Sequence, residues 1–482
     1  MQWLLLVTFA LPLLGAAVPL LMKKASPRAI AWTMFGIIAA TGAFVWWTIL
    51  AVPAETVTLA RFSDRIVLAF RLDGAARIFA GLVAALWPVT ALYAVSYMRD
   101  EERLPLFFSF FTLSFPVTLG IAFSANIFTM YCFYEMLTLA TFPLVLHPMT
   151  HNAVKATVRY VLFSLGGAAL GFASMMYLMT HGGDGLFTLG GLDLSADGPA
   201  LLFFFFGFLG FGVKAAVFPV HLWLPTATVA PTPVTALLHA VAVVKAGAFA
   251  LIRLGWYAYG PTLLAGTWAQ YAALGLCIFT VFFGSYMAIR EQHWKRRLAY
   301  STISNISYIL FGVYLLTEVG LTAGILHMLN HSVIKILAFF CAGAVLKKAS
   351  VTDVGDLGKL NGAMPVTAAC FTVSAIALTG IPPFGGFVSK WKLLVAGFET
   401  DSPLALAGSI VLIVSALFTA VYMLLPATSL CFPARRKYHA AAERNEADAC
   451  MTVPMLLLAA ACLLTGIFGQ SLIDLIQTLI FG

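Results

Sequence analysis

Long apolar stretches follow one another along nearly the whole chain, and the short segments between them hold most of the charged residues. A helix needs about 20 apolar residues to cross the hydrocarbon of a bilayer. The pattern therefore predicts an all-α polytopic membrane protein with about fourteen spanning helices and no large soluble domain. The predicted spans are residues 2–21, 29–51, 75–97, 105–122, 124–147, 156–180, 200–224, 232–257, 266–288, 299–316, 320–346, 364–398, 403–426 and 450–480.

The composition agrees with this pattern, because 61% of the 482 residues are hydrophobic and only 10% are charged. Such a balance lies far from that of soluble globular proteins. The first apolar stretch could be taken for a secretory signal, yet no basic residue precedes it, and Lys23, Lys24 and Arg28 follow it. We therefore expect it to remain as a spanning helix with its N-terminus outside.

The motifs limit the chemistry that this chain can carry by itself. Its seven cysteines show no C-x-x-C spacing and lie mostly within apolar stretches, so we interpret them as small hydrophobic residues. No glycine-rich nucleotide-binding motif is present. We expect no cofactor and no metal on this chain, and whether it belongs to an enzyme depends on its partners.

Basic residues cluster after the odd-numbered predicted spans, which places those loops in the cytoplasm and both termini outside the cytoplasmic membrane. They are Lys23, Lys24, Arg28, Arg99, Arg103, Lys155, Arg159, Arg290, Lys295, Arg296, Arg297, Lys347, Lys348, Lys359, Arg435, Arg436, Lys437 and Arg444. The opposite loops carry Asp184, Asp193, Asp197, Glu318, Glu399 and Asp401, with Arg61, Arg65 and Arg71 as exceptions. This bias accounts for the net charge of +8, so we expect no nucleic-acid partner.

A small set of titratable residues lies deep inside the predicted spans. One charge at a helix centre costs roughly 2.5–3.5 kcal/mol on insertion scales, so five of them amount to a penalty on the order of 15 kcal/mol. Water or charged partners must offset that penalty, which favours an ion pathway over a purely structural role. The set comprises Glu135, Lys214, His239, Lys245, His327, His331, Lys335 and Lys390, with Lys392 close enough to a helix end to reach the headgroups.

The stretch HMLNHSVIK carries three of these residues at i, i+4 and i+8. This spacing places His327, His331 and Lys335 within an arc of about 80° on one helix face, with about 6 Å between successive side chains. One or two waters can bridge such a gap, and imidazole can pass a proton between its two nitrogens near neutral pH. The ladder suits proton relay better than metal binding, since no carboxylate or thiolate is near in sequence.

Glu135, in MYCFYEMLTLATF, is the one acidic residue deep in a predicted span, so it needs a cationic partner. Lys214 and Lys245 are the candidates. Pairing with Glu135 would hold a lysine protonated, and separation from it in a dry pocket would favour release of the proton. The pair would thus act as a switch.

Two predicted spans contain helix breakers beside a lysine. In GFGVKAAVFPVHLWLP, Lys214 precedes Pro219, and in LTGIPPFGGFVSKWK, Lys390 follows a Pro-Pro and Gly-Gly break. Unwound backbone at membrane depth should line a wet cavity, and two such spans in corresponding positions indicate an internal repeat. Spans four to eight and nine to thirteen would then be two inverted five-helix repeats, although residue identity does not reveal them.

Five stretches together resemble one family, the antiporter-like membrane subunits of respiratory complex I, multisubunit Na+/H+ (Mrp-type) antiporters and membrane-bound hydrogenases. They lie between about residues 95 and 400. The stretches are FYEMLTLATFPL, FGVKAAVFPVHLWLPTATVAPTPVTALLHAVAVVKAGAF, RRLAYSTISNISYI, HMLNHSVIKILAFFCAGAV and LTGIPPFGGFVSKWKLL.

The resemblance implies fourteen helices with discontinuous seventh and twelfth helices, and a proton path through the residues named above. By matching motif, Glu135 takes the fifth-helix glutamate, Lys214 the seventh-helix lysine, and His239 with Lys245 the eighth-helix pair. His327, His331 and Lys335 match the central ladder, and Lys390 the twelfth-helix lysine. The expected units are residues 1–100 (helices 1–3), 101–260 and 261–427 (the repeats), and 428–482 (a cytoplasmic loop and the last helix).

We expect a non-redox, proton-translocating subunit in the membrane arm of a complex-I-like or hydrogenase-type oxidoreductase. The alternative is a subunit of a gradient-driven Na+/H+ antiporter. Partners would include similar antiporter-like subunits and the lipid bilayer, with protons and, in the alternative, Na+ as the transported ions. The family's lateral helix has no counterpart after the last span, which favours an inner position in a row of subunits. A spacer without pumping, or an independent solute carrier, fits the polar midplane residues less well.

Overall fold

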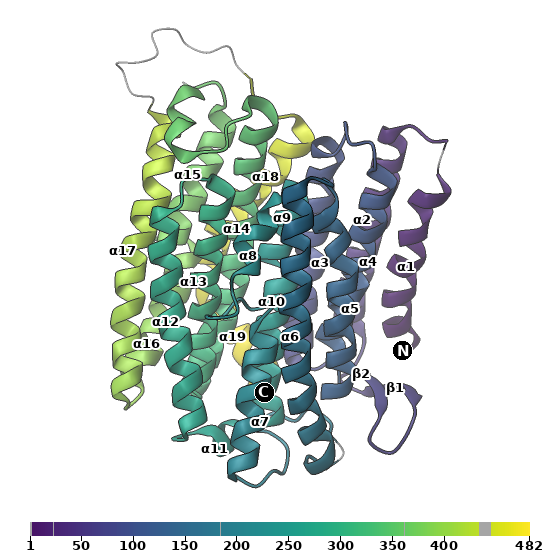
Figure 1. Ribbon diagram of the computed structural model, residues 1–482, viewed down its shortest axis with the longest axis vertical. Helices are drawn as coiled ribbons and strands as arrows, with labels where there is room; N and C mark the ends of the chain where they lie inside the picture. The colour runs from purple at the N-terminus through teal and green to yellow at the C-terminus, as the bar shows by residue number, and fades with distance from the viewer. Residues whose placement is uncertain (1, 23, 184, 361, 433–444) are drawn as a thin grey trace.

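The computed structural model describes residues 2–22, 24–183, 185–360, 362–432 and 445–482. Its helices run mostly along one direction, with α1 and α2 at one edge of the bundle and α17 at the other (Figure 1). Six predicted loop charges lie outside the described residues: Lys23, Asp184, Arg435, Arg436, Lys437 and Arg444.

The first six helices alternate in direction and pack on their neighbours in sequence. Their starts follow capping chemistry, because the side chains of Ser26, Asp73, Asn126 and Thr150 accept backbone N–H bonds in the first turns of α2, α3, α5 and α6. The bounds are α1 Gln2–Leu21, α2 Pro27–Ala51, α3 Gly74–Tyr97, α4 Leu104–Phe123, α5 Ile127–Leu146 and α6 His151–His181, with an antiparallel hairpin of β1 Thr56–Arg61 and β2 Val67–Arg71 after α2.

The rest of the chain mixes long helices with interrupted ones. The long helices are α12 Trp268–Arg290, α13 Trp294–Tyr314, α14 Glu318–Ala349, α17 Pro403–Cys431 and α18 Ala449–Ile467. The shorter elements are α7 Gly198–Gly212, α8 Trp223–Thr226, η1 Ala227–Val229, α9 Thr232–Ala240, α10 Val243–Ile252, η2 Arg253–Ala258, α11 Pro261–Leu264, η3 Val354–Leu360, α15 Pro365–Thr379, α16 Gly385–Glu399 and α19 Gly469–Phe481.

The predicted polytopic helical membrane fold is confirmed in this coarse form. Within the described residues, eleven helical segments are long and apolar enough to cross a membrane, and α7 and α15 are shorter apolar helices. The segment of α13 falls outside this set because lysine, arginine, serine and asparagine lower its hydropathy, although α13 packs between α12 and α14. Its serine, threonine and asparagine side chains are buried within the protein and do not face lipid.

Several predicted spans are not continuous helices. The span predicted at 200–224 leaves the helix at Gly212 and resumes at Trp223, and the span at 364–398 is divided between Thr379 and Gly385. Gly380 takes a positive φ of 91°, which glycine adopts without steric penalty, and two prolines follow it. The spans at 232–257 and 450–480 are also each divided, which the sequence did not predict, and the segment expected as a plain second loop holds the β1–β2 hairpin.

We call one end of the bundle the basic face. Its described basic residues are Lys24, Arg28, Arg99, Arg103, Lys155, Arg159, Arg290, Arg296, Lys347, Lys348 and Lys359. Two residues predicted for its loops are placed differently, because Lys295 and Arg297 are only 6% and 7% exposed. They lie in the first turn of α13, where Lys295 donates to the carbonyl oxygen of Ala230 at 2.7 Å. The prediction placed both in the loop before residue 299 and was wrong for them, since they lie in the helix.

A buried ion pair joins α3 to η2 near the opposite end of the bundle. Both terminal nitrogens of Arg253 donate to the Asp73 carboxylate at 2.7 Å, and the Arg253 side chain is fully buried. The guanidinium also stacks over the ring of Tyr257, at 4.5 Å from its centroid. Sequence reasoning did not select Arg253, although it lies inside a predicted span.

Replacing Asp73 with asparagine is expected to lower the free energy of unfolding by about 3–5 kcal/mol, because it leaves Arg253 as a buried cation without its carboxylate. Asparagine keeps the helix cap, so the loss reports on the ion pair. Thermal unfolding of the purified protein in detergent measures it. Asp64→Asn is the control: Asp64 pairs with Arg61 at 3.8 Å on the exposed hairpin, and its loss should change stability by less than about 1 kcal/mol. Equal effects of the two changes would contradict this assignment.

Candidate functional site

The eight titratable residues selected from the sequence lie in the interior of the bundle. Seven of them are at most 8% exposed, and the side chain of Glu135 is 24% exposed. They come from five parts of the chain: α5, the break after α7, α9 with α10, α14 and α16. Buried ionisable groups require partners, so their contacts decide what the site can do.

Glu135 of α5 has Lys214 as its partner, with 3.8 Å between the carboxylate oxygen Oε1 and Nζ. The same Nζ donates to the carbonyl oxygen of Tyr134 at 2.5 Å and lies 3.3 Å from the centroid of the Tyr134 ring. These two contacts with Tyr134 favour the ammonium form of Lys214, since a carbonyl dipole and an aromatic face attract a cation. Of the two lysines that the sequence left open as partners, the geometry selects Lys214.

The break after α7 keeps its freed backbone groups satisfied without a helix. The Val213 carbonyl oxygen accepts from the Trp223 indole at 2.7 Å, and the Phe218 N–H donates to the Thr280 hydroxyl at 3.1 Å. Such compensation is what allows unwound backbone at membrane depth. The break thereby fixes Lys214 between α5 and α10, and Gly247 of α10 packs directly on its peptide.

The centre of the site is a contact between Lys245 of α10 and His331 of α14, with 2.7 Å between Nζ and Nδ1. One turn away, the ring of His327 stacks on that of His331 at a centroid distance of 5.9 Å. Imidazole Nε2 of His331 has no hydrogen-bond partner among the described residues. The two histidines therefore form the stacked part of the predicted ladder, with a lysine at one end.

His327 extends the connection to two further helices. Its Nδ1 lies 2.9 Å from the Ser389 hydroxyl of α16, and its Nε2 lies 3.2 Å from the Asn305 side-chain oxygen of α13. The Tyr308 ring lies between His327 and Lys390, at 5.4 Å from the imidazole centroid and 5.3 Å from Nζ. A line of polar groups thus runs from α10 across α14 to α16.

Lys390 of α16 is held by the end of the preceding half-helix. Its Nζ donates to the carbonyl oxygens of Leu378 at 2.6 Å and Thr379 at 3.3 Å. These are the last carbonyls of α15, which have no intrahelical partner because the helix stops there. The negative end of the α15 dipole therefore stabilises the Lys390 ammonium.

Lys335 does not continue the stack of the two histidines. Its Nζ donates to the Leu298 carbonyl oxygen at 3.1 Å and to the Ser301 hydroxyl of α13. Asn305 closes this branch, since its side-chain amide donates to the Ser301 carbonyl oxygen at 2.7 Å. The three-rung ladder predicted from spacing is thus a two-histidine stack with a side branch toward α13, because partners on α13 draw the lysine away.

His239 is fully buried at the end of α9, and neither ring nitrogen has a hydrogen-bond partner among the described residues. Its ring lies 5.0 Å from that of Phe339. A buried polar group without a partner costs about 1–3 kcal/mol, so this position calls for a functional reason. The electrostatic neighbours of His239 include Lys335, Lys295 and Lys245, which places it between the basic face and the central lysines.

Sequence reasoning missed the neutral polar residues that connect the charged ones: Ser301, Asn305, Tyr308 and Ser389. The stretch STISNISYI carries Ser301, Asn305 and Tyr308 at spacings of four and three, which is a helix-face signal that was available.

All seven cysteines are free, and the described residues contain no group of three or more histidine, cysteine, aspartate or glutamate side chains placed to hold a metal ion.

A family profile described as "NADH:quinone oxidoreductase/Mrp antiporter, TM" matches residues 124–419. The chain belongs to this family. It is 31% identical over 419 residues to NADH-quinone oxidoreductase subunit N of Desulforudis audaxviator, covering 82% of this chain and 80% of that one. The profile match over residues 124–419 includes every residue of the candidate site.

Two other relatives have names that indicate different roles. The A/B subunit of a probable K(+)/H(+) antiporter of Rhizobium meliloti is 32% identical over 82% of this chain, which spans only 40% of that protein. Hydrogenase-4 component B of Escherichia coli is 30% identical, with 82% of this chain matching 62% of that one. The chain is an antiporter-like membrane subunit by these relationships, and it corresponds to only part of these two longer proteins.

Solved structures share the fold. A chain of the membrane-bound sulfane sulfur reductase, an archaeal respiratory membrane complex, superposes with a TM-score of 0.85 at 22% identity, covering 98% of this chain and 96% of that one. A chain of the Mrp complex from a Dietzia species gives a TM-score of 0.83 at 22% identity, covering 99% and 52%. Both structures are multisubunit membrane assemblies.

Proposed function

We propose that the chain translocates protons as one subunit of a multisubunit membrane complex, using Glu135, Lys214, His239, Lys245, His327, His331, Lys335 and Lys390. The observation that carries the proposal is the run of contacts from Lys245 through His331 and His327 to Ser389 of α16. It links groups that gain and lose protons across the middle of the bundle. A packing role alone would not need titratable side chains in contact.

Each part of the site has a distinct task in this scheme. The Glu135–Lys214 pair holds a proton on Lys214 while the two groups are close, and their separation leaves a buried ammonium that passes the proton toward α10. Lys245 and the two imidazoles carry it across α14, because each ring can accept at one nitrogen and donate from the other. Lys390 receives it beside the free carbonyls of α15. Water completes the links where side chains do not touch.

The finer architecture that fits this scheme has fourteen spanning helices in two inverted five-helix repeats. The first repeat runs from α4 to η2, within residues 101–260, and the second runs from α12 to α17, where α17 ends at Cys431, four residues beyond the proposed unit 261–427. The fourth helix of each is interrupted beside a lysine, Lys214 or Lys390. The directions of the first helices support this inversion, since α4 starts at the basic face and α12 ends there (Figure 1). Residues 1–100 and 428–482 flank the repeats.

The basic face lies in the cytoplasm in this proposal, and both ends of the described chain face the outside of the cytoplasmic membrane. Lys295 and His239 then lie between the cytoplasm and the central lysines. Protons would therefore enter from the cytoplasm past these two residues. Glu135 instead faces the side of the bundle, where it lines an otherwise largely apolar groove of about 500 Å³ between α5 and α6. A neighbouring similar subunit seated against that groove would reach the carboxylate.

Two assemblies could use this chemistry. The first is the membrane arm of a complex-I-like or hydrogenase-type oxidoreductase, in which redox partners drive the protons. The second is a Na+/H+ antiporter powered by ion gradients alone. Purification of the complex from native membranes separates them, because iron–sulfur subunits support the first and an assembly of small membrane subunits supports the second.

Reconstitution of that complex into proteoliposomes tests the proposed function itself. A proton gradient that forms on addition of the driving substrate, or of Na+, and collapses with a protonophore supports it. An intact complex that turns over without moving protons would contradict it.

A further inference from the structure

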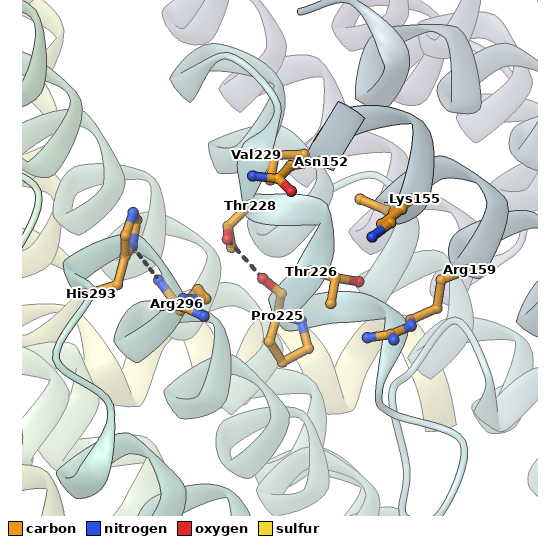
Figure 2. Close-up of a pocket in the computed structure, with 10 residues that line it drawn as sticks. Asn152, Lys155, Arg159, Pro225, Thr226, Thr228, Val229, His293 and Arg296 are labelled. Atoms are coloured by element: carbon orange, nitrogen blue, oxygen red, sulfur yellow. Dashed lines mark hydrogen bonds between the residues drawn. The ribbon is translucent and has the colours of Figure 1, made fainter. Parts of the chain in front are cut away.

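A cavity of about 450 Å³ opens at the basic face, away from the proton-carrying residues. It lies between the first turns of α6, the α8–η1 segment and the start of α13. Figure 2 shows Lys155 and Arg159 of α6 on one side, both directed toward Thr226, and Arg296 of α13 on the other. Its volume falls in the range of about 300–1,000 Å³ that is typical of small-ligand sites.

The cavity has an unbalanced positive charge. Lys155, Arg159 and Arg296 are its cationic lining residues, and no carboxylate lines it. Among the described residues, neither Lys155 nor Arg159 has a carboxylate within ion-pair distance, and Arg296 pairs with Glu291 at 3.4 Å. The fourth basic residue, His293, is the N-cap of α13. Its Nδ1 accepts the backbone N–H of Arg296, and burial lowers the pKa of its ring.

Backbone dipoles add to this charge. Both α6 and α13 begin beside the cavity, so the positive ends of their dipoles lie near it. Three cations and two helix starts around one space attract an anion with several acceptor oxygens, such as phosphate, and the planar forks of the two arginines match its oxygens.

The surroundings of the cavity are those of a lipid and not of a soluble ion. The helices end at this level, where headgroups lie. Beside α8, the apolar side chains of Leu222 and Val229 are exposed. A ligand with a phosphate at one end and acyl chains at the other would satisfy both surfaces.

We propose that this cavity binds the phosphate of an anionic phospholipid on the cytoplasmic side. Basic pockets between helices at this face are suited to such headgroups. The bound lipid would join α6 to α13 across α8 and η1. It would thereby hold the segment that follows the break at Lys214, on the cytoplasmic side of that break. The inference concerns binding and stands whether or not the chain moves protons.

The test compares phosphatidylglycerol with phosphatidylcholine in mixed micelles added to the delipidated full chain, with binding read by native mass spectrometry and by thermal stabilisation. Wild type should prefer phosphatidylglycerol, and Lys155→Gln/Arg159→Gln should weaken that binding about tenfold. Lys24→Gln/Arg28→Gln removes two exposed charges from the same face outside the cavity and should change it less than about twofold. Thr226→Phe, which fills the cavity and keeps its charges, should also weaken it.

Other results would overturn the proposal. Equal losses in the cavity and control double variants would mean that the lipid responds only to the charge of the whole face. Equal stabilisation by inorganic phosphate alone would identify a free-anion site. A cross-link in the intact complex from position 155 to an acidic segment of another subunit would identify a protein partner.

Discussion

Replacing Lys214 with methionine is expected to abolish coupled proton translocation, reducing its rate by at least about tenfold, which corresponds to about 1.4 kcal/mol on the barrier. Methionine keeps the length of the side chain but cannot carry a proton. It also leaves Glu135 without the cation 3.8 Å away, so the pair can no longer act as a switch. The measurement is the initial rate of proton movement into proteoliposomes that contain the assembled complex.

A complex that fails to assemble would also lose proton flux. The variant complex is therefore compared with wild type by subunit composition and size. Lys347→Met is the matched control, because Lys347 pairs with Asp100 at 2.8 Å on the basic face and takes no part in the proposed path. Its pumping should stay within about twofold of wild type. An assembled Lys214→Met complex that pumps at the normal rate would remove Lys214 from the mechanism.

Replacing Lys390 with methionine should cause a loss of similar size for a different physical reason. The Leu378 and Thr379 carbonyls at the end of α15 would lose their donor, and the path would lack a proton acceptor after His327. Each buried carbonyl left without a partner destabilises the break by about 1–3 kcal/mol, so a lower melting temperature should accompany the loss of pumping. Proton flux and thermal unfolding are measured on the same preparation.

Lys392 provides a close control, since it lies two residues further along α16 and is half-buried. Lys392→Met should leave both flux and melting temperature near those of wild type. If Lys390→Met lowered the melting temperature while flux per assembled complex stayed normal, Lys390 would be a structural residue of the break only.

The helices could be predicted well because a single property, apolar length, determines them. The ends of α1, α3 and α17 lie at or within a few residues of the predicted spans. The division at Val241 could not be predicted, because no proline or glycine lies beside it. Gly466 and Gly469 flank the division at Phe468, so a sequence signal was available there and was missed. The burial of Lys295 was also missed: a lysine beside two arginines resembles a loop, and only packing against Ala230 places it inside.

The residues of the candidate site could be recognised because they are charged or titratable and lie within apolar spans. The contacts between these residues could not be predicted. Helical spacing brought His327 and His331 together correctly, since both lie on one helix. The partner of Lys245 and the turn of Lys335 toward Ser301 depend on helices far apart in sequence. Single-sequence periodicity specifies the face of a helix and says nothing about which neighbour covers it.

The central claim, that protons cross α14 through the side chain of His331, is tested most directly by comparing two substitutions at that position. Alanine leaves a space that water can occupy and so can carry protons in place of the ring, whereas leucine fills the space with hydrocarbon. Proton flux in proteoliposomes should therefore be partly retained in His331→Ala and lost in His331→Leu, with both complexes assembled. Flux in His331→Leu equal to that of wild type would contradict the account.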